Sequence, residues 1–205
     1  MPMRLGLLGP CGGHERELEI AARGLRERLG AERVVYLGAD RALDLVVGRW
    51  VVDLVGGQGT DDTLMARATA VCLAADAATI DLFIQHEKER EELRMFESLA
   101  GSATRSVELI AGKVAVLVHD KAYLEEEDIL PASALVFGKS REPLVKQIGR
   151  RWFLSPGSFP HHGVMLLDDD TGELRASMYS AELEPGESRI LEAPKALRMR
   201  ALGAG

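Results

Sequence analysis

The sequence has few cysteines and no long apolar run, and each scarcity excludes a class of protein. Cys11 and Cys72 are the two cysteines among 205 residues, too few for the disulfide framework of a small secreted domain. No stretch approaches the roughly 18 consecutive apolar residues of a transmembrane helix. The first residues lack the charged start and the small-residue cleavage site of a signal peptide. We therefore expect a cytoplasmic protein that does not act at a membrane.

A basic surplus is also missing. The formal net charge is −7, whereas a general nucleic-acid-binding protein needs a basic face, so we expect no nucleic-acid partner. Apolar residues make up 46% of the chain. This length and composition fit one domain with a packed core.

The first forty residues predict a parallel βαβ unit. A short apolar run at Arg4–Leu8 indicates a strand, and Arg33–Leu37 is rich in β-branched residues. Between them, His14–Leu29 carries leucines and alanines at helical spacing and ends at Gly30, a residue typical of helix C-termini. Strand, helix and strand in this order favour a parallel pair with a helical crossover.

The middle of the chain is predicted to be mainly helical. We expect a short helix at Arg41–Gly48 and a strand at Trp50–Val55. From Asp61 to Leu99 the apolar spacing is that of a helix, either one long helix or two that are broken near Asp76–Thr79. Cys72 lies in this apolar stretch, and we expect it in the core.

The C-terminal half is predicted to be rich in strands, because short apolar runs alternate there with Gly-containing turns. After Pro185 the pattern fades, and we expect a tail that is partly disordered. The candidate strands are Ser106–Ile110, Lys113–Val118, Leu135–Phe137, Leu144–Ile148, Arg151–Leu154, Val164–Asp168 and Glu173–Tyr179.

Short motifs follow several of these strands. The first strand ends in Gly9-Pro10-Cys11 and the second in Gly38-Ala39-Asp40. A glycine-rich loop, Gly57-Gln58-Gly59-Thr60, comes next. Later loops read His119-Asp120-Lys121, Gly138-Lys139-Ser140-Arg141 and Ser155-Pro156-Gly157-Ser158. In order and strand pattern these segments resemble the small calcineurin-like metallophosphoesterases.

The resemblance implies a fold. It implies a four-layer αββα sandwich, in which two mixed β-sheets are flanked by helices, over residues 1–184. The segment 61–100 is then a helical insertion, and 185–205 is a C-terminal tail. The insertion could cap the pocket, form a homodimer interface, or pack on its own sheet.

The resemblance also implies where metal ligands should stand, and most of them are replaced. Gly9 and Cys11 occupy the positions of an Asp and a His that bind one metal, and Ala39 that of an Asp that bridges two metals, with Asp40 one position late. Gln58 takes the place of an Asn. His119 is kept, whereas Lys121, Lys139 and Arg141 replace three histidines.

These replacements bear on the chemistry. Two-metal hydrolysis needs carboxylates and imidazoles that hold ions about 3.5–4 Å apart with a position open for water. A Lys or Arg at about 4 Å from a divalent ion repels it by several kcal/mol. We therefore expect neither a conventional dinuclear site nor any cofactor. Lys121, Lys139 and Arg141 could instead bind an anion, or they could be solvated loop residues.

Other interpretations use the same loops. His161 and His162, with Cys11 and His119, could form a mononuclear zinc or iron site, or they could be exposed histidines of a surface loop. Cys11 as a nucleophile is disfavoured, because the C-x5-R spacing of a cysteine phosphatase is absent. The alternative to a pseudoenzyme is an active hydrolase with a rearranged metal site. Such a site would hold Mn or Zn and hydrolyse phosphomonoesters or phosphodiesters. Its candidate ligands are Cys11, Asp40, Gln58, His119 and either His161 or His162.

We therefore predict a pseudoenzyme of this fold. It would bind a protein partner or a small anionic ligand, and it could form a homodimer through the helices of residues 61–100. By analogy, a retromer scaffold subunit resembles these enzymes in fold and acts by protein contact.

Overall fold

Two β-sheets form the body of the molecule, which a computed structural model describes over residues 3–57, 59–74, 76–170 and 172–192. The first sheet has six strands in the order β11-β10-β9-β1-β2-β3, and the second has five in the order β4-β5-β6-β8-β7. Both sheets mix parallel and antiparallel neighbours. The strands of the first are β1 (Arg4–Leu8), β2 (Arg33–Tyr36), β3 (Phe96–Ser98), β9 (Val164–Asp168), β10 (Arg175–Tyr179) and β11 (Pro185–Ile190). Those of the second are β4 (Arg105–Ile110), β5 (Lys113–Val118), β6 (Ala134–Phe137), β7 (Leu144–Ile148) and β8 (Arg151–Ser155).

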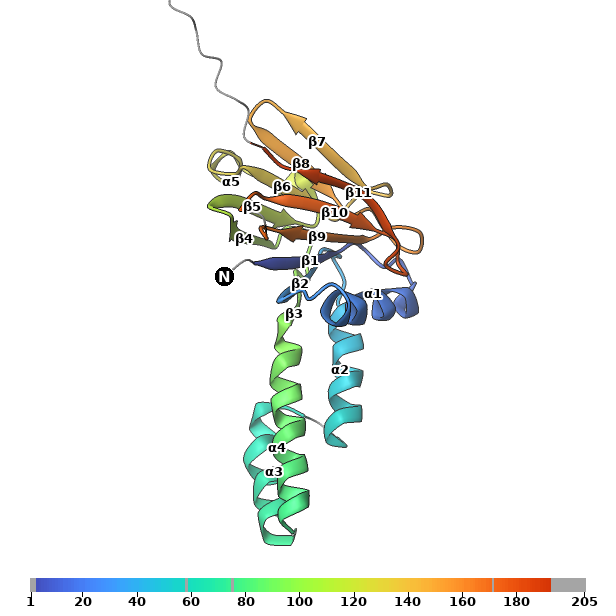
Figure 1. The fold of residues 1–205 in the computed structure, drawn as a ribbon, viewed down its shortest axis with the longest axis vertical. Helices are drawn as coiled ribbons and strands as arrows, with labels where there is room; N and C mark the ends of the chain where they lie inside the picture. Colours follow the sequence, from blue (N-terminus) through green and yellow to red (C-terminus); the bar gives the residue numbers. More distant parts are fainter. Residues whose placement is uncertain (1–2, 58, 75, 171, 193–205) are drawn as a thin grey trace, which may run out of the picture.

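Helices complete the layers (Figure 1). The helix α1 (Glu15–Glu27) and the helix α2 (Ala42–Val55) pack on the first sheet and bury one apolar cluster with it. A second cluster fills the space between the two sheets. The outer face of the second sheet has a thin cover, a 3-10 turn η2 (Lys121–Tyr123) and the four-residue helix α5 (Glu126–Ile129), over a small third cluster. The predicted αββα sandwich is confirmed, with a reduced fourth layer.

The predicted βαβ unit is confirmed. The strands β1 and β2 are parallel, with Leu5 opposite Arg33 and Leu8 opposite Tyr36. The helix α1 connects them and buries Leu18, Ala21, Ala22 and Leu25 on the sheet. This arrangement places the ends of β1 and β2, and the loops that follow them, at one edge of the sheet.

The prediction of a short helix followed by a strand at Trp50–Val55 is wrong. A single helix, α2, runs through Val55. Leu43, Val46 and Trp50 are buried at spacings of three and four residues, which is the period of a helix face and not that of a strand. The β-branched residues here line that helix, because packing on the sheet outweighs their preference for strands.

The segment from Asp61 to Leu99 forms two helices, as one alternative predicted, but it also contains a strand. The helix α3 (Asp61–Ala74) and the helix α4 (Ala77–Glu92) are separated at Asp76, whose side chain accepts a hydrogen bond from the Thr79 N–H at 2.9 Å. After a 3-10 turn, η1 (Leu93–Met95), the strand β3 pairs with β2. This strand was not predicted from the sequence.

The helical hairpin of α3 and α4 extends away from both sheets (Figure 1). It therefore does not cap the loops at the ends of β1 and β2, and α4 packs instead beside α2. Cys72 is exposed on this hairpin, so its predicted place in the core is wrong. No helix among the described residues is long and apolar enough to cross a bilayer.

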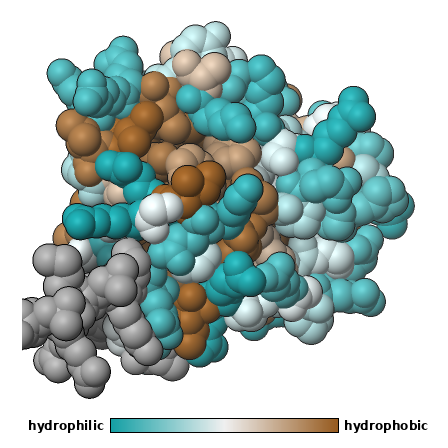
Figure 2. All heavy atoms as spheres, turned by 90° about the horizontal axis from the view of Figure 1, so that it is seen from above, coloured by the Kyte–Doolittle hydropathy of each residue, from teal (hydrophilic) through white to brown (hydrophobic). Residues whose placement is uncertain are grey.

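The C-terminal segment is more ordered at its start than the sequence indicated. Pro185–Ile190 forms β11, which pairs with β10, and Leu191 is fully buried. The remainder of the expected tail, 193–205, lies outside the described residues. Seen from the end of the molecule that carries β7 and β11, the surface shows several apolar areas among hydrophilic side chains (Figure 2).

Candidate functional site

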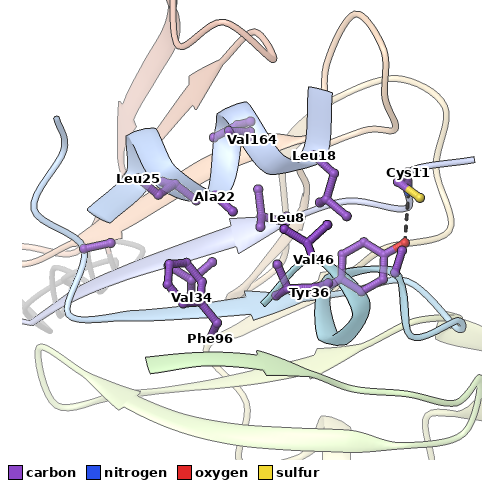
Figure 3. Close-up of a cluster of buried hydrophobic side chains, with 14 of the residues drawn as sticks. Leu8, Cys11, Leu18, Ala22, Leu25, Val34, Tyr36, Val46, Phe96 and Val164 are labelled. Carbon is purple, nitrogen blue, oxygen red and sulfur yellow. Dashed lines mark hydrogen bonds between the residues drawn. The ribbon is translucent and has the colours of Figure 1, made fainter. Parts of the chain in front are cut away.

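The hydroxyl of Tyr36 occupies the centre of the candidate site. Tyr36 ends β2 and is fully buried, and Cys11 is 3% exposed. The Cys11 backbone N–H donates to the Tyr36 hydroxyl at 3.0 Å, and that hydroxyl donates to Asp40 Oδ1 at 2.8 Å. Burial raises the pKa of the phenol far above its ordinary value, so Tyr36 stays protonated. Figure 3 shows the ring reaching across the cluster toward Cys11.

Asp40 is committed to local hydrogen bonds. Its Oδ1 also accepts from the Ala42 N–H at 3.0 Å, at the start of α2. An aspartate that accepts the backbone N–H two residues further on forms an Asx turn, which here leads into α2. Ala39, at the position implied for the bridging ligand, offers only a methyl group. Gln58 lies outside the described residues.

His119 is the candidate residue whose geometry most resembles that of a metal ligand. It follows β5, is half-buried, and its Nδ1 lies 2.8 Å from the Leu37 carbonyl oxygen. Because a carbonyl oxygen can only accept, Nδ1 is the donor in this contact, and in a neutral ring Nε2 is then an acceptor. A histidine oriented by its second nitrogen is the arrangement that metal ligands use. The same bond ties the second sheet to the end of β2.

The three candidate cations have different surroundings. Lys139 Nζ lies 2.5 Å from Asp120 Oδ2, and this hydrogen-bonded pair raises the pKa of Lys139 and lowers that of Asp120. Lys121 Nζ lies 5.3 Å from the centre of the Phe137 ring. Arg141 is exposed, and its side chain has no hydrogen bond or ion pair to the described part of the chain. Arg141 is thus the one of the three whose side chain contacts no described residue through a hydrogen bond, ion pair or ring.

Close backbone contacts fill the space beside Gly9. A Cβ added at Gly9 would lie 1.9 Å from the Gly157 carbonyl oxygen, and the Gly9 N–H donates to the Gly163 oxygen at 2.8 Å. The Pro156-Gly157 turn thus packs directly on the end of β1. An aspartate at position 9 does not fit unless this loop moves.

His161 and His162 follow the Pro156-Gly157 turn, and the His162 Cβ lies close to Gly157. Both line a cavity of about 370 Å³ together with Leu144, Met178 and Tyr179, and His162 Nε2 is 3.3 Å from Glu142 Oε2. This cavity and three others on the described surface have no lining from Cys11, Asp40 or His119. Over the residues that are described, no three His, Cys, Asp or Glu side chains are grouped to hold a metal ion.

The residues of the candidate site do not fit a pair of metal ions. One imidazole is suitably oriented, but Asp40 is engaged by Tyr36 and Ala42, and Lys139 is held beside His119 by a hydrogen bond from its N–H to the His119 carbonyl at 2.7 Å. This donor set lacks the carboxylates that would neutralise two divalent ions. The arrangement can hold loops together and present Arg141.

Two residues that organise the site, Tyr36 and Asp120, were not predicted from the sequence. Tyr36 appears in the sequence as the end of an apolar strand, and Asp120 as a polar loop residue after His119. The signal for Asp120 was its place between His119 and Lys121, where a carboxylate can neutralise a nearby cation. The sequence alone contains no comparable signal for Tyr36.

Comparison with known proteins places the chain by fold. No family model matches the sequence, and no curated protein sequence matches it. Among solved structures, a single-mutant Vps29 from Entamoeba histolytica has 15% sequence identity and a TM-score of 0.50, with 92% of this chain and 99% of that chain covered.

Two further structures match at lower TM-scores. A predicted phosphoesterase from Streptococcus pneumoniae TIGR4 has 12% identity and a TM-score of 0.48, over 93% of this chain and 97% of that chain. A protein described as a novel archaeal phosphodiesterase has 12% identity and a TM-score of 0.48, over 86% and 99%. At such identities a likeness shows the fold alone. The chain has the calcineurin-like metallophosphoesterase fold.

Proposed function

We propose that this chain is a binding protein built on a phosphoesterase fold, and that it binds a protein partner instead of hydrolysing a phosphoester with two metal ions. The observation that carries the proposal is the Tyr36 hydroxyl, which joins the Cys11 N–H to Asp40. It makes Asp40 part of a hydrogen-bonded framework. A hydrolytic centre would need that carboxylate free to bind an ion.

A protein partner is favoured over a small anion by the charges and by the exposed apolar side chains. Lys139 is neutralised by Asp120, which removes one of the three candidate cations from the charge available to an anion. Val107 and Leu109 on the edge strand β4 are 62% and 67% exposed. Exposed apolar side chains that lie together are typical of protein-binding surfaces.

An anionic ligand is the second candidate, because the Arg141 guanidinium is exposed and has no partner in the described part of the chain. Titration calorimetry with inorganic phosphate tests it, with Arg141→Ala as the variant and Arg150→Ala as the control cation. Binding to the wild type that is lost in Arg141→Ala alone would favour the anion over the protein.

Metal content tests the loss of the hydrolytic centre. The full chain would be incubated with manganese or zinc, desalted and subjected to elemental analysis, with His119→Ala in parallel. We expect no metal in stoichiometric amount in either protein. One or two ions per chain that disappear in His119→Ala would contradict the proposal and support the rearranged metal site.

A further inference from the structure

The strand β4 has a free edge. It is the first strand of the second sheet and pairs with β5 on one side (Figure 1). The two-residue turn Ala111-Gly112, with φ of 50° and 69°, joins the two strands, so Ile110 and Lys113 close the hairpin as a hydrogen-bonded pair. Every second residue of β4 counted back from Ile110 is then bonded to β5. The N–H and C=O groups of Val107 and Leu109 therefore point away from the sheet.

The other three sheet edges carry features that keep a further strand from adding. The strand β3 has three residues, and β11 begins with Pro185-Gly186 and pairs with β10 through a register shift. The strand β7 has an exposed Lys146 at its middle, and Arg189 donates to the Val145 carbonyl oxygen at 3.4 Å. Short length, proline, irregular pairing and lysine are the usual protections of an edge. The six residues of β4 include none of these.

The outer face of β4 continues an apolar row that is left uncovered. Val107 lies opposite Val116 of β5, and Leu109 lies opposite Val114. The two β5 residues belong to the small cluster on the outer face of the second sheet. Val107 and Leu109 are nevertheless 62% and 67% exposed. A strand laid along β4 would bond the free backbone groups and cover both side chains.

The inner face of β4 is acidic. Glu108 points inward, and its carboxylate accepts from Arg33 Nη1 and from Ser106 Oγ, each at 2.6 Å. An inward charge can protect an edge, but this one is compensated within the chain. Arg33 also pairs with Glu97 on β3, whose side chain is 50% exposed. One guanidinium thus faces two carboxylates beside the free edge.

The outer face is acidic as well. Arg105, the first residue of β4, pairs with Asp128 and lies 3.9 Å from Glu125. Glu126 and Glu127 follow in α5 and are exposed. Two further cations of this sheet lie farther from β4, Lys121 over Phe137 of β6 and Arg151 on β8. A strand that adds to β4 is therefore favoured if it is basic.

The C-terminal tail has the matching sequence pattern. Residues 193–205 contain Lys195, Arg198 and Arg200 and no acidic residue. Apolar residues alternate with the two arginines, at Leu197, Met199 and Ala201. In a strand, this period of two places the apolar side chains on one face and the arginines on the other. The apolar face suits the uncovered row of β4, and the arginines then turn toward the carboxylates of the inner face.

The described chain ends close to this edge. The Leu191 carbonyl oxygen accepts from Lys113 Nζ at 2.6 Å, and Lys113 lies opposite Ile110, the last residue of β4. The 13 residues after Glu192 span up to about 45 Å when extended, whereas the six residues of β4 span about 20 Å. A segment that starts at the Ile110 end and follows β4 runs antiparallel to it.

We propose that residues 197–202 bind along β4 of the same chain, as an antiparallel sixth strand of the second sheet. The short connection gives the segment a high effective concentration at this edge. The bound segment covers Val107 and Leu109, so a protein partner that uses these side chains has to displace it. The proposed loss of two-metal hydrolysis depends on Tyr36 and Asp40 instead, and the metal measurement tests it separately.

Amide hydrogen exchange, followed by NMR on the full chain, tests the proposal. We expect the Val107 and Leu109 N–H groups to be protected in the wild type, and to exchange more than about tenfold faster in the double variant Arg198→Glu, Arg200→Glu. The double variant Lys146→Glu, Arg150→Glu makes the same charge change on the β7–β8 hairpin and should keep the protection. Free exchange of both amides in the wild type, or equal protection in the two double variants, would overturn the proposal.

Disulfide trapping tests which chain supplies the strand. In a Cys72→Ser background, Val107→Cys and Met199→Cys together should form a disulfide within one chain under mild oxidation, because both side chains lie on the outer face. Gln147→Cys on the edge strand β7, combined with Met199→Cys, is the control and should not. Equal yields in the two proteins would refute the contact. A covalent dimer in place of the cross-linked monomer would assign the strand to a second copy and overturn the proposal.

Discussion

The Tyr36 hydroxyl donates a hydrogen bond to Asp40 Oδ1 at 2.8 Å while it accepts one from the Cys11 N–H at 3.0 Å. These bonds connect the end of β1, the end of β2 and the start of α2. In an enzyme of this fold that space would need open ligand positions. In this protein Tyr36 is a buried side chain whose hydroxyl has both a hydrogen-bond donor and an acceptor at that point.

Tyr36→Phe should lower the free energy of unfolding by about 1–3 kcal/mol, because it leaves the buried Cys11 N–H without an acceptor. Urea denaturation followed by circular dichroism measures the change. Tyr123→Phe is the control, since Tyr123 is 49% exposed and should cost little. Equal stability of Tyr36→Phe and the wild type would show that the hydroxyl is not a structural link.

Gly9→Ala and Gly48→Ala should change stability in opposite directions. A Cβ at residue 9 would lie 1.9 Å from the Gly157 carbonyl oxygen, and forcing atoms into such a contact costs about 1–3 kcal/mol or more. A Cβ at residue 48, inside α2, meets nothing within 4 Å, and Ala in a helix interior is favoured over Gly by about 0.5–1 kcal/mol. Thermal unfolding of the two variants tests whether the close approach at Gly9 is real. A Gly9→Ala protein as stable as the wild type would show that the loop can move to admit a side chain.

Asp168 and Asp170 should respond to pH with opposite signs. Burial raises the pKa of Asp168, so its ionised form costs stability above the ordinary carboxyl pKa of about 3.9. A hydrogen bond from Arg4 lowers the pKa of Asp170, so its ionised form contributes stability above the same pH, and that contribution is lost on acidification.

Replacing each carboxyl by an amide separates these two effects. Asp168→Asn should gain stability over the wild type as the pH rises from about 3 to 7, because the penalty of the buried charge is removed. Asp170→Asn should be less stable than the wild type at neutral pH and equal to it in acid. Denaturant titrations at several pH values test this, and the same pH response in both variants would refute the assignment.

Local patterns in the sequence predicted the elements that carry their own signal. Helical spacing in α1 and the apolar runs of β1 and β2 were sufficient for the βαβ unit. The strands β3 and β11 could not be predicted in this way. All six residues of β11 are exposed and β3 has three residues, so it is pairing with β10 and β2 that makes them strands. In α2, the β-branched residues of Trp50–Val55 suggested a strand, but the segment is helical because its apolar face packs on the sheet.

The sequence predicted which loops form the candidate site, but not the hydrogen bonds that their residues make. The positions of Cys11, Asp40 and His119 after β1, β2 and β5 followed from the motifs. Their partners did not, because the hydroxyl of Tyr36 and the Leu37 carbonyl reach them through the tertiary packing. The exposure of Cys72 was likewise hidden, since apolar composition alone cannot tell a buried helix from one that projects from the domain.

The most direct test of the central claim is the hydrolysis of bis(p-nitrophenyl) phosphate by the full chain with manganese or zinc, compared with His119→Ala prepared in the same way. We predict that wild type and variant release p-nitrophenol at the same rate as the metal in buffer alone. A metal-dependent rate in the wild type that disappears in His119→Ala would show that the chain is an active phosphoesterase, and it would contradict the proposed loss of two-metal hydrolysis.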